Sequence, residues 1–372
     1  MAKSSFTLNP AKIKVIGCGG GGCNAVTRMV QENIQGVEFI AMNTDAQAMA
    51  LTEAPTRIQL GERLTRGLGV GGDHTVGQKA AEESRDDIKN VVTGADMVFI
   101  TAGMGGGTGT GSAPVVAEIA KQSGALTIAV VTKPFVFEGQ NRMNVAEDGI
   151  NNLISKVDTL IIIPNDKLLE LCDQKTGVDS AFKMADDVLR HGVQAISEVI
   201  TVPGVINLDF ADVSKVMKDS GPAWMSMGSG KGQNRAADAA KAALASPLLD
   251  ESASGAKGVL FNIVGDSSLT LFEVNEAAEI IRGAVDPEAN IIFGVAHDPT
   301  MENEIKITLI ATGFAAREKE VDLSKDPEMA ELLTSLKTRE DELDVPSFLR
   351  RRPLFNHRRP VTAPSYKPVS KN

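Results

Sequence analysis

The sequence predicts an α/β protein in which a parallel sheet flanked by helices is joined by one long helix to a smaller α+β domain. Strand-like and helix-like runs alternate from Lys12 to Val131, which is typical of a parallel sheet with helices on both faces. Two of the turns in this alternation are rich in glycine. The third observation is the run 178–202, which has the length and apolar spacing of a single helix that packs on two sides.

The composition fits an ordinary globular protein with room for two cores. The chain has 372 residues, of which 42% are hydrophobic and 23% are charged. Its net charge of -10 argues against nucleic acid as the main partner. Cys18, Cys23 and Cys172 form no C-x-x-C pair, so we expect neither a disulfide framework nor a zinc site, and a cytoplasmic location fits. No apolar run reaches the roughly 18 residues of a membrane span.

The first glycine-rich turn, 17–22, lies between a strand at 12–16 and a helix beginning at 23–30. A second strand, 37–42, ends at Asn43, Thr44 and Asp45. These residues satisfy the pattern G-x-G-x-x-G with an acidic residue about 20 positions on, which is the fingerprint of a dinucleotide-binding Rossmann unit. An oxidoreductase is therefore one alternative.

The second glycine-rich turn, 103–111, is the stretch around which the first domain is organised. It lies between a strand at 96–101 and a helix at 112–121. Successive glycines let backbone N–H groups point into one concavity in front of a helix N-terminus, which suits phosphate. No lysine follows the last glycine, so the Walker pattern is absent. Two such loops can hold several phosphates, whereas a dehydrogenase needs only the first, so a triphosphate is favoured.

The other elements of this domain are expected to bring their loops to the same place. Ligands of parallel sheets lie beyond the carboxyl ends of the strands, where the glycine turns, the loop 61–72 and the loop 132–141 should gather. Within the last loop, Glu138 would accept from ribose hydroxyls and Arg142 would pair with a phosphate or with Glu138. The expected elements are a strand at 57–60, one helix at 75–90, and strands at 126–131 and 159–163.

The long helix carries two adjacent acids, Asp186 and Asp187. Carboxylates there would accept from the N–H groups of guanine, whereas adenine does not present the same donors. A solvated helix face is the alternative interpretation.

Two further acids, Asp209 and Asp212, stand three apart at a helix start. They would be either helix caps or a pair that orients an attacking water. The long helix separates them from the glycine turns by about 30 Å or more at 1.5 Å per residue. They could therefore act only on the nucleotide of another subunit.

A second domain is expected from about residue 221. It would hold strands at 223–229, 258–264, 291–296 and 305–311, with helices at 235–245 and 271–282. A charged linker, 317–342, precedes an apolar cluster at 343–349, which suggests a recognition segment. From Arg350 onward the tail is basic, so acidic partners or an anionic membrane surface are possible contacts.

Several of these motifs together resemble the tubulin/FtsZ family, and bacterial FtsZ in particular, from Lys12 to Phe314. The turn 105–111, the segment 207–212 and the tail 343–352 each match a motif of that family, in the same order. The resemblance implies a GTP-binding and GTP-hydrolysing protein that polymerises head to tail and forms the cell-division ring at midcell, with Mg²⁺ bound mainly through the phosphates. It also implies adaptor proteins that bind Leu343 to Arg352.

The resemblance further implies a role for individual residues and a division of the chain. Asp209, Asp212 and Asn207 would act catalytically on the neighbouring subunit's nucleotide. The expected nucleotide contacts are Gly19, Gly20, Gly21, Gly22, Asn24, Asn43, Gly103, Gly105, Gly106, Gly107, Thr108, Gly109, Thr110, Gly111, Glu138, Arg142, Asn165, Phe182, Asp186 and Asp187. The expected parts are an N-terminal extension at 1–11, a GTP-binding domain at 12–177, a central helix at 178–203, a C-terminal domain at 204–316, the linker at 317–342 and the tail at 343–372.

Two alternatives to a polymerising GTPase stay open at this point. A Rossmann oxidoreductase would carry nicotinamide or flavin absorbance, and it gives no role to the second glycine turn. A GTP-dependent scaffold would bind the nucleotide without releasing phosphate.

Overall fold

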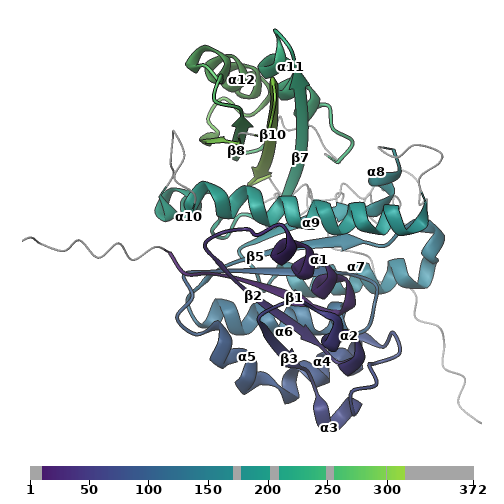
Figure 1. Ribbon diagram of the computed structural model, residues 1–372. Coiled ribbons are helices and arrows are strands. Elements are labelled where there is room, and N and C mark those ends of the chain that lie inside the picture. The colour runs from purple at the N-terminus through teal and green to yellow at the C-terminus, as the bar shows by residue number, and fades with distance from the viewer. Residues whose placement is uncertain (1–10, 171–176, 202–208, 249–254, 299, 315–372) are drawn as a thin grey trace, which may run out of the picture. The chain divides into compact units, whose positions relative to one another are not determined.

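The computed structural model describes residues 11–170, 177–201, 209–248, 255–298 and 300–314. Over these residues ten strands form one sheet in the order β3-β2-β1-β4-β5-β6-β7-β10-β8-β9 (Figure 1). The expected N-terminal extension, linker and tail lie outside the described residues, apart from Ala11. The domain boundaries stay predictions.

The first six strands are parallel, as the alternation predicted. They are β1 (Ile13–Cys18), β2 (Val37–Asn43), β3 (Thr56–Gln59), β4 (Met97–Gly103), β5 (Leu126–Lys133) and β6 (Thr159–Pro164). Central strand β4 is buried from Met97 to Ala102, because a parallel sheet is covered on both faces.

The second part of the sheet is mixed. Strand β10 (Glu304–Thr312) runs antiparallel to both β7 (Gly221–Lys231) and β8 (Gly258–Gly265). Strand β9 (Asn290–His297) is parallel to β8. Helices α11 (Arg235–Leu244) and α12 (Leu271–Ala284) contribute to a core of their own with these strands, around Phe261 and Ile307. The two parts join where β6 pairs with β7 in parallel, from Thr159 opposite Gly221 to Ile161 opposite Ala223.

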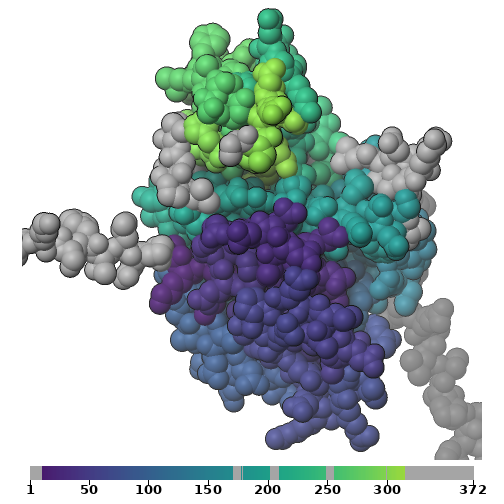
Figure 2. Space-filling model, viewed as in Figure 1, coloured from purple at the N-terminus to yellow at the C-terminus, as the bar shows by residue number. Residues whose placement is uncertain are grey.

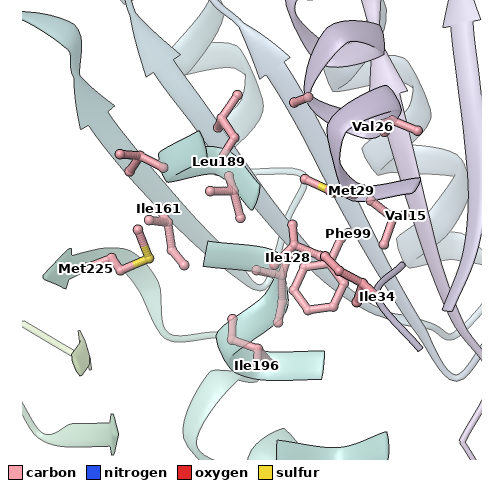
Figure 3. Close-up of a cluster of buried hydrophobic side chains, with 14 of the residues drawn as sticks. Val15, Val26, Met29, Ile34, Phe99, Ile128, Ile161, Leu189, Ile196 and Met225 are labelled. Carbon is pink, nitrogen blue, oxygen red and sulfur yellow. The ribbon is translucent and has the colours of Figure 1, made fainter. Parts of the chain in front are cut away.

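Two apolar cores cover the two faces of the parallel strands. On one face, Val15, Phe99 and Ile128 pack with Met29 of α1 (Gly19–Gln31) and Leu189 of α9 (Val178–Thr201), as Figure 3 shows. The intervening residues Ile16, Val98 and Ile100 point to the other core. That core includes side chains of α4 (His74–Glu83), α5 (Arg85–Val92), α6 (Thr108–Gln122) and α7 (Gln140–Ile154).

Helix α9 is the long helix that the sequence predicts, and it contacts β5 in the first part of the sheet and β8 and β9 in the second. In Figure 2 its teal surface lies between the purple and blue surface of the N-terminal elements and the green surface of the C-terminal ones. The shorter helices are α2 (Ala46–Leu51), α3 (Glu62–Thr65), α8 (Asn165–Leu169), α10 (Phe210–Met217) and the 3-10 turn η1 (Val136–Glu138).

Three expected helices differ most from those observed. The helix expected over 75–90 is divided into α4 and α5 at Ser84, whose hydroxyl accepts a hydrogen bond from the Gly61 N–H at 3.0 Å. Helices α1 and α6 begin inside the glycine turns, at Gly19 and Thr108, earlier than their apolar residues suggest. Glycine permits this because the two helix starts pack backbone to backbone: a Cβ on Gly19 would lie 2.6 Å from the Gly109 nitrogen.

Candidate nucleotide site

A cavity of about 480 Å³ opens at the carboxyl ends of the parallel strands. It is lined by both glycine turns, by the ends of β2 and β5, by residues 69–72, and by the N-terminal parts of α8 and α9. This is the gathering of loops that the sequence predicts.

Some glycines of the first turn line the cavity, and others pack closely against neighbouring backbone. Gly20 and Gly21 line the cavity, whereas Gly19 and Gly22 do not. Gly22 packs against β4, since a Cβ there would lie 2.3 Å from the Thr101 carbonyl oxygen. Cys18 provides no side-chain cap for α1, so N–H groups of its first turn are available to an anion.

The second glycine turn is divided in the same way. Its lining residues are Gly103, Gly106, Gly107, Thr108 and Gly109. Gly105, Thr110 and Gly111 are not among them, although we expected them to contact the nucleotide. The Thr110 hydroxyl accepts from the Gly105 N–H at 2.9 Å. Gly111 packs on α4, where a Cβ would lie 2.2 Å from the His74 carbonyl oxygen.

Hydroxyl groups at the cavity wall join the second glycine turn to the residue that follows β2. The Thr44 and Thr108 hydroxyl oxygens are 2.6 Å apart, and the Asn43 side chain accepts from the Thr44 N–H at 2.9 Å. Asn43 thereby lines the cavity and holds the end of β2 in place.

Several lining residues were not assigned from the sequence. They are Thr44, Asp45, Ala48, Gly69, Val70, Gly71, Gly72, Met104, Thr132, Pro134 and Ala185. Most of them follow a predicted strand directly or belong to the predicted loops 61–72 and 132–141. That position is the signal that could have identified them.

Glu138 and Arg142 both line the cavity and form an ion pair with each other. The Glu138 carboxylate also accepts from the Phe135 N–H at 2.9 Å. The Arg142 side chain is half exposed, so it can turn toward a phosphate while Glu138 stays fixed.

Four side chains that line the cavity are suited to bind a nucleotide base. They are Asn24, Asn165, Phe182 and Asp186. The buried Oδ1 of Asn165 has no hydrogen-bond partner among the described residues, so it can accept from an N–H group of a ligand. Phe182, an expected nucleotide contact, is 41% exposed and meets Phe135 edge to face at 5.4 Å between ring centroids.

Of the two neighbouring acids, the cavity is lined by Asp186 and not by Asp187. Asp187 pairs instead with Arg28 at 3.3 Å and with Arg190 at 3.6 Å. Phe182 and Asp186 are four residues apart and so lie on one face of α9, while Asp187 is turned by a further 100°. Of the two acids expected to contact the base, Asp186 is therefore the one placed to do so.

The pKa of the Asp186 carboxyl is raised to about 6, mainly by burial. This is the net result of burial, of Arg28, whose Nε lies 3.4 Å from the Asp186 carboxylate and which lowers the pKa, and of the Asp187 carboxylate, which raises it.

Asp209 and Asp212 lie outside the cavity, at the start of α10. Asp209 caps that helix, accepting from the Asp212 N–H at 2.8 Å, and both side chains are exposed. Figure 1 shows α10 near one end of α9 and α8, which begins at Asn165, near the other. Asn207 lies outside the described residues.

The comparisons with known proteins identify the relatives of this chain. The model of the GTPase domain of the Tubulin/FtsZ family matches residues 12–173, and that of the FtsZ family C-terminal domain matches residues 221–315. A structure titled as an empty FtsZ dimer of M. jannaschii is 48% identical, with a TM-score of 0.79 over 82% of this chain and 88% of that one. This chain belongs to the FtsZ family.

Other FtsZ-related structures agree with the fold. A point mutant of the M. jannaschii FtsZ, with tyrosine in place of a tryptophan, is also 48% identical, with a TM-score of 0.80 over 82% of this chain and 92% of that one. The CetZ2 protofilament of Haloferax volcanii, bound to GTPγS, is 19% identical, with a TM-score of 0.70 over 88% of this chain and 99% of that one, which shows the fold alone. The cavity of this FtsZ-family chain is built largely by its GTPase domain.

The described residues contain no helix that is both long and apolar enough to cross a membrane. They also contain no group of three or more His, Cys, Asp or Glu side chains arranged to hold a metal ion.

Proposed function

We propose that this FtsZ-family GTPase binds GTP in the described cavity, polymerises head to tail, and hydrolyses GTP only where two subunits meet. The main observation behind the proposal is the separation of the phosphate-binding loops from the acids. The cavity lies at the carboxyl ends of the strands, whereas Thr159, at the other end of β6, donates to the carbonyl oxygen of Met217, the last residue of α10. Asp209 and Asp212, at the start of α10, lie outside the cavity, and α10 is near the end of α9 opposite to α8 (Figure 1), so we infer that these acids need a second subunit to reach a nucleotide.

The described contacts assign a role to each end of the cavity. The glycine turns and the N-termini of α1 and α6 would bind the phosphates, and Glu138 and Arg142 would contact the ribose and a phosphate. Where the guanine base would bind, the Asp186 carboxylate would accept hydrogen bonds from its N1–H and N2–H groups, while Phe182 would stack on its ring. Asn24 and Asn165 would complete the contacts.

The chemistry of this site fits Mg²⁺ held through the nucleotide rather than by a protein cage. The carboxylates of Asp45 and Glu138 at the cavity are engaged by backbone N–H groups at 2.8 Å and 2.9 Å. Mg²⁺ commonly keeps several waters and binds phosphate oxygens, where it would neutralise charge on the phosphates. Hydroxyl groups of Thr44 and Thr108 stand at the cavity wall as further oxygen donors.

Asp209 and Asp212 would position the attacking water, with Asn207 beside them. Asp212→Ala should bind GTP normally and hydrolyse it about 10²-fold more slowly. Phosphate release from GTP, measured against protein concentration, tests the shared site, because activity per molecule should rise with concentration. Constant specific activity far below the assembly threshold would contradict it.

A mixing experiment separates a shared site from a damaged one. Asp212→Ala combined with a variant defective in GTP binding should recover some turnover, because one mixed interface joins an intact cavity to an intact pair of acids. Absence of any recovery would indicate that both functions belong to the same subunit. GTP binding without phosphate release by the wild-type chain would instead indicate a scaffold.

We further propose a cytoplasmic location in a division ring at midcell, with the segment Leu343–Arg352 binding adaptor proteins. The apolar residues of this segment follow a charged linker and precede a basic tail, which would reach the membrane only indirectly or through its charge. A chain truncated after Glu342 should keep its GTP turnover in solution and lose adaptor binding. Loss of turnover on truncation would place the tail in the catalytic core instead.

A further inference from the structure

A single arginine joins the base end of the cavity to the helix beside it. Arg28 lies in the last turn of α1, and its guanidinium contacts Asp186 through Nε at 3.4 Å and Asp187 through Nη1 at 3.3 Å. The Arg28 side chain is 25% exposed and the Asp186 side chain 18% exposed, so solvent screens this pair only in part. Asp187 has Arg190 as a second cationic partner.

Arg28 does not line the nucleotide cavity. It lines an adjoining groove of about 490 Å³ between α1, α2 and α9, and this groove shares Asn24, Phe182 and Asp186 with the cavity. The arginine therefore contacts the Asp186 carboxylate from the side of this groove, whereas the ligand would contact that carboxylate from the side of the cavity.

The protonation state of Asp186 decides which base it can bind. A carboxylate only accepts hydrogen bonds, and guanine presents two donors, N1–H and N2–H, on the edge that would face it. A protonated carboxyl group can donate a hydrogen bond, and adenine presents an acceptor at N1, where guanine presents the N1–H donor. Burial favours the neutral form, and a nearby cation favours the charged form.

We propose that Arg28 is a positioning residue that sets the purine preference of the site, by keeping Asp186 an ionised acceptor with a fixed orientation. The proposal rests on the function proposed above, in which Asp186 faces the base. Because Asp187 keeps Arg190 when Arg28 is removed, the two acids would respond differently. Asp186 would lose its cation and still have a carboxylate neighbour on the same helix.

Several other charged groups lie near Asp186 and bear on how its ionisation depends on pH. On α9 they are Asp179, Lys183, Asp187 and Arg190, and on α1 the group is Arg28. Asp45, before α2, lines the same cavity and is engaged as a helix cap. Glu138 and Arg142, which also line the cavity, are paired with each other. Burial raises the pKa of Asp186 to about 6, so its ionisation changes in an accessible range.

The test is competition of unlabelled GDP and ADP against a fluorescently labelled GDP, from about pH 5 to about pH 8. In the wild-type chain the preference for GDP should fall as the pH drops through about 6. In Arg28→Met the fall should begin about one pH unit higher, which lowers the preference at neutral pH by up to about tenfold. Arg28→Lys should restore most of the wild-type profile, since it restores the charge.

Two matched variants make the result specific. Lys183→Met removes a positive charge from the same groove that forms no ion pair with Asp186 among the described residues, so it should shift the profile much less than Arg28→Met does. Asp186→Asn should make the preference independent of pH, because an amide does not titrate.

The possible failures of the two proposals are distinguishable. If Arg28→Met is folded by circular dichroism and has the wild-type profile, or if Lys183→Met shifts it equally, the role of Arg28 is refuted while guanine binding stands. If Asp186→Asn keeps the wild-type pH dependence, another group titrates and the role of Arg28 is likewise refuted. If the wild-type chain binds ADP and GDP equally at neutral pH, the proposed guanine site fails and the role of Arg28 fails with it.

Discussion

The imidazole Nε2 of His191 lies 3.0 Å from the Lys306 ammonium nitrogen and 2.9 Å from Nη2 of Arg190. Lysine and arginine only donate hydrogen bonds, so Nε2 must be the unprotonated acceptor. Burial, together with the charges of Lys306 and Arg190, lowers the pKa of His191 to about 3. A neutral histidine is thus a condition of packing between α9 and β10.

This contact predicts a pH dependence of stability. The folded pKa of His191 is lower than that of an unfolded histidine, about 6.5, so its contribution is fully present above pH 6.5. The contribution is lost as the pH falls from 6.5 toward 3, by up to about 1.4 kcal/mol per pH unit. Urea unfolding of the wild type and His191→Gln, at neutral pH and about pH 5, should show a steeper loss in the wild type.

Nearby Glu198 makes a comparison of variants necessary. Burial raises the pKa of Glu198, so this group binds protons more tightly in the folded state and opposes the loss caused by His191. The difference between wild type and His191→Gln isolates the histidine. His297→Gln, at an exposed position, is the control that should keep the wild-type slope. Equal slopes in all three chains would show that His191 is not the titrating group.

The buried guanidinium of Arg235 predicts a large effect on stability. Arg235 is 4% exposed, and its Nε and Nη2 atoms contact the two Glu273 carboxylate oxygens at 2.6 Å and 3.2 Å. Asp266 lies 3.3 Å from Nη1. Removing one partner of such a cluster leaves buried charges unpaired, so Arg235→Met should lower the free energy of unfolding by about 3 kcal/mol.

Arg235→Lys should recover less than half of this loss, because an ammonium cannot reproduce the two parallel contacts with Glu273. Lys241→Met, on an exposed part of the same helix, is the matched control. Calorimetry or urea unfolding gives the free energies, and nucleotide affinity should not change in either variant. A full rescue by lysine would mean that only the charge matters.

Two glycines of the first turn should respond in opposite ways to alanine. A methyl group on Gly22 would meet the Thr101 carbonyl oxygen at 2.3 Å, so Gly22→Ala should destabilise the fold by about 2 kcal/mol or more. A Cβ on Gly20 meets no atom within 4 Å, but Gly20 lines the cavity. Gly20→Ala should therefore keep the melting temperature and weaken GDP binding. A lower melting temperature for Gly20→Ala, together with unchanged stability of Gly22→Ala, would contradict these separate roles of the two glycines.

Cys18 and Cys23 are predicted to be chemically inert in the folded protein. Burial raises the pKa of each thiol to about 12, and only the thiolate reacts readily. At pH 8 about one molecule in 10⁴ would carry either thiolate. In a Cys172→Ser chain, Ellman's reagent should react slowly with the folded protein and with two thiols after denaturation. Rapid reaction of the folded chain would show that this region opens.

The strand ends and glycine turns could be predicted because their signal is local. Consecutive glycines after a strand are sufficient to indicate a backbone anion site. The separate roles of those glycines could not be predicted, since Gly22 is constrained by Thr101 and Gly111 by His74, both distant in the sequence. The division of one expected helix at Ser84 has the same cause, because its partner is Gly61.

The choice between Asp186 and Asp187 shows a different limit. The spacing of four from Phe182 could have favoured Asp186, but neighbouring acids look equivalent until their partners are known. Arg28 comes from α1, far away along the chain, and contacts both acids, whereas Asp187 also pairs with Arg190 and Asp186 lines the cavity. Asn207 and the tail lie outside the described residues, so their roles stay predictions.

Strand β6 is fixed at both of its ends. Thr159 donates to the Met217 carbonyl oxygen of α10, and Pro164 is followed at once by Asn165 at the cavity. Six residues of extended backbone span about 20 Å and cannot lengthen without breaking ladder hydrogen bonds on both sides. If subunits stack as proposed, the fixed length of this strand would set much of the distance along the filament from one nucleotide to the next.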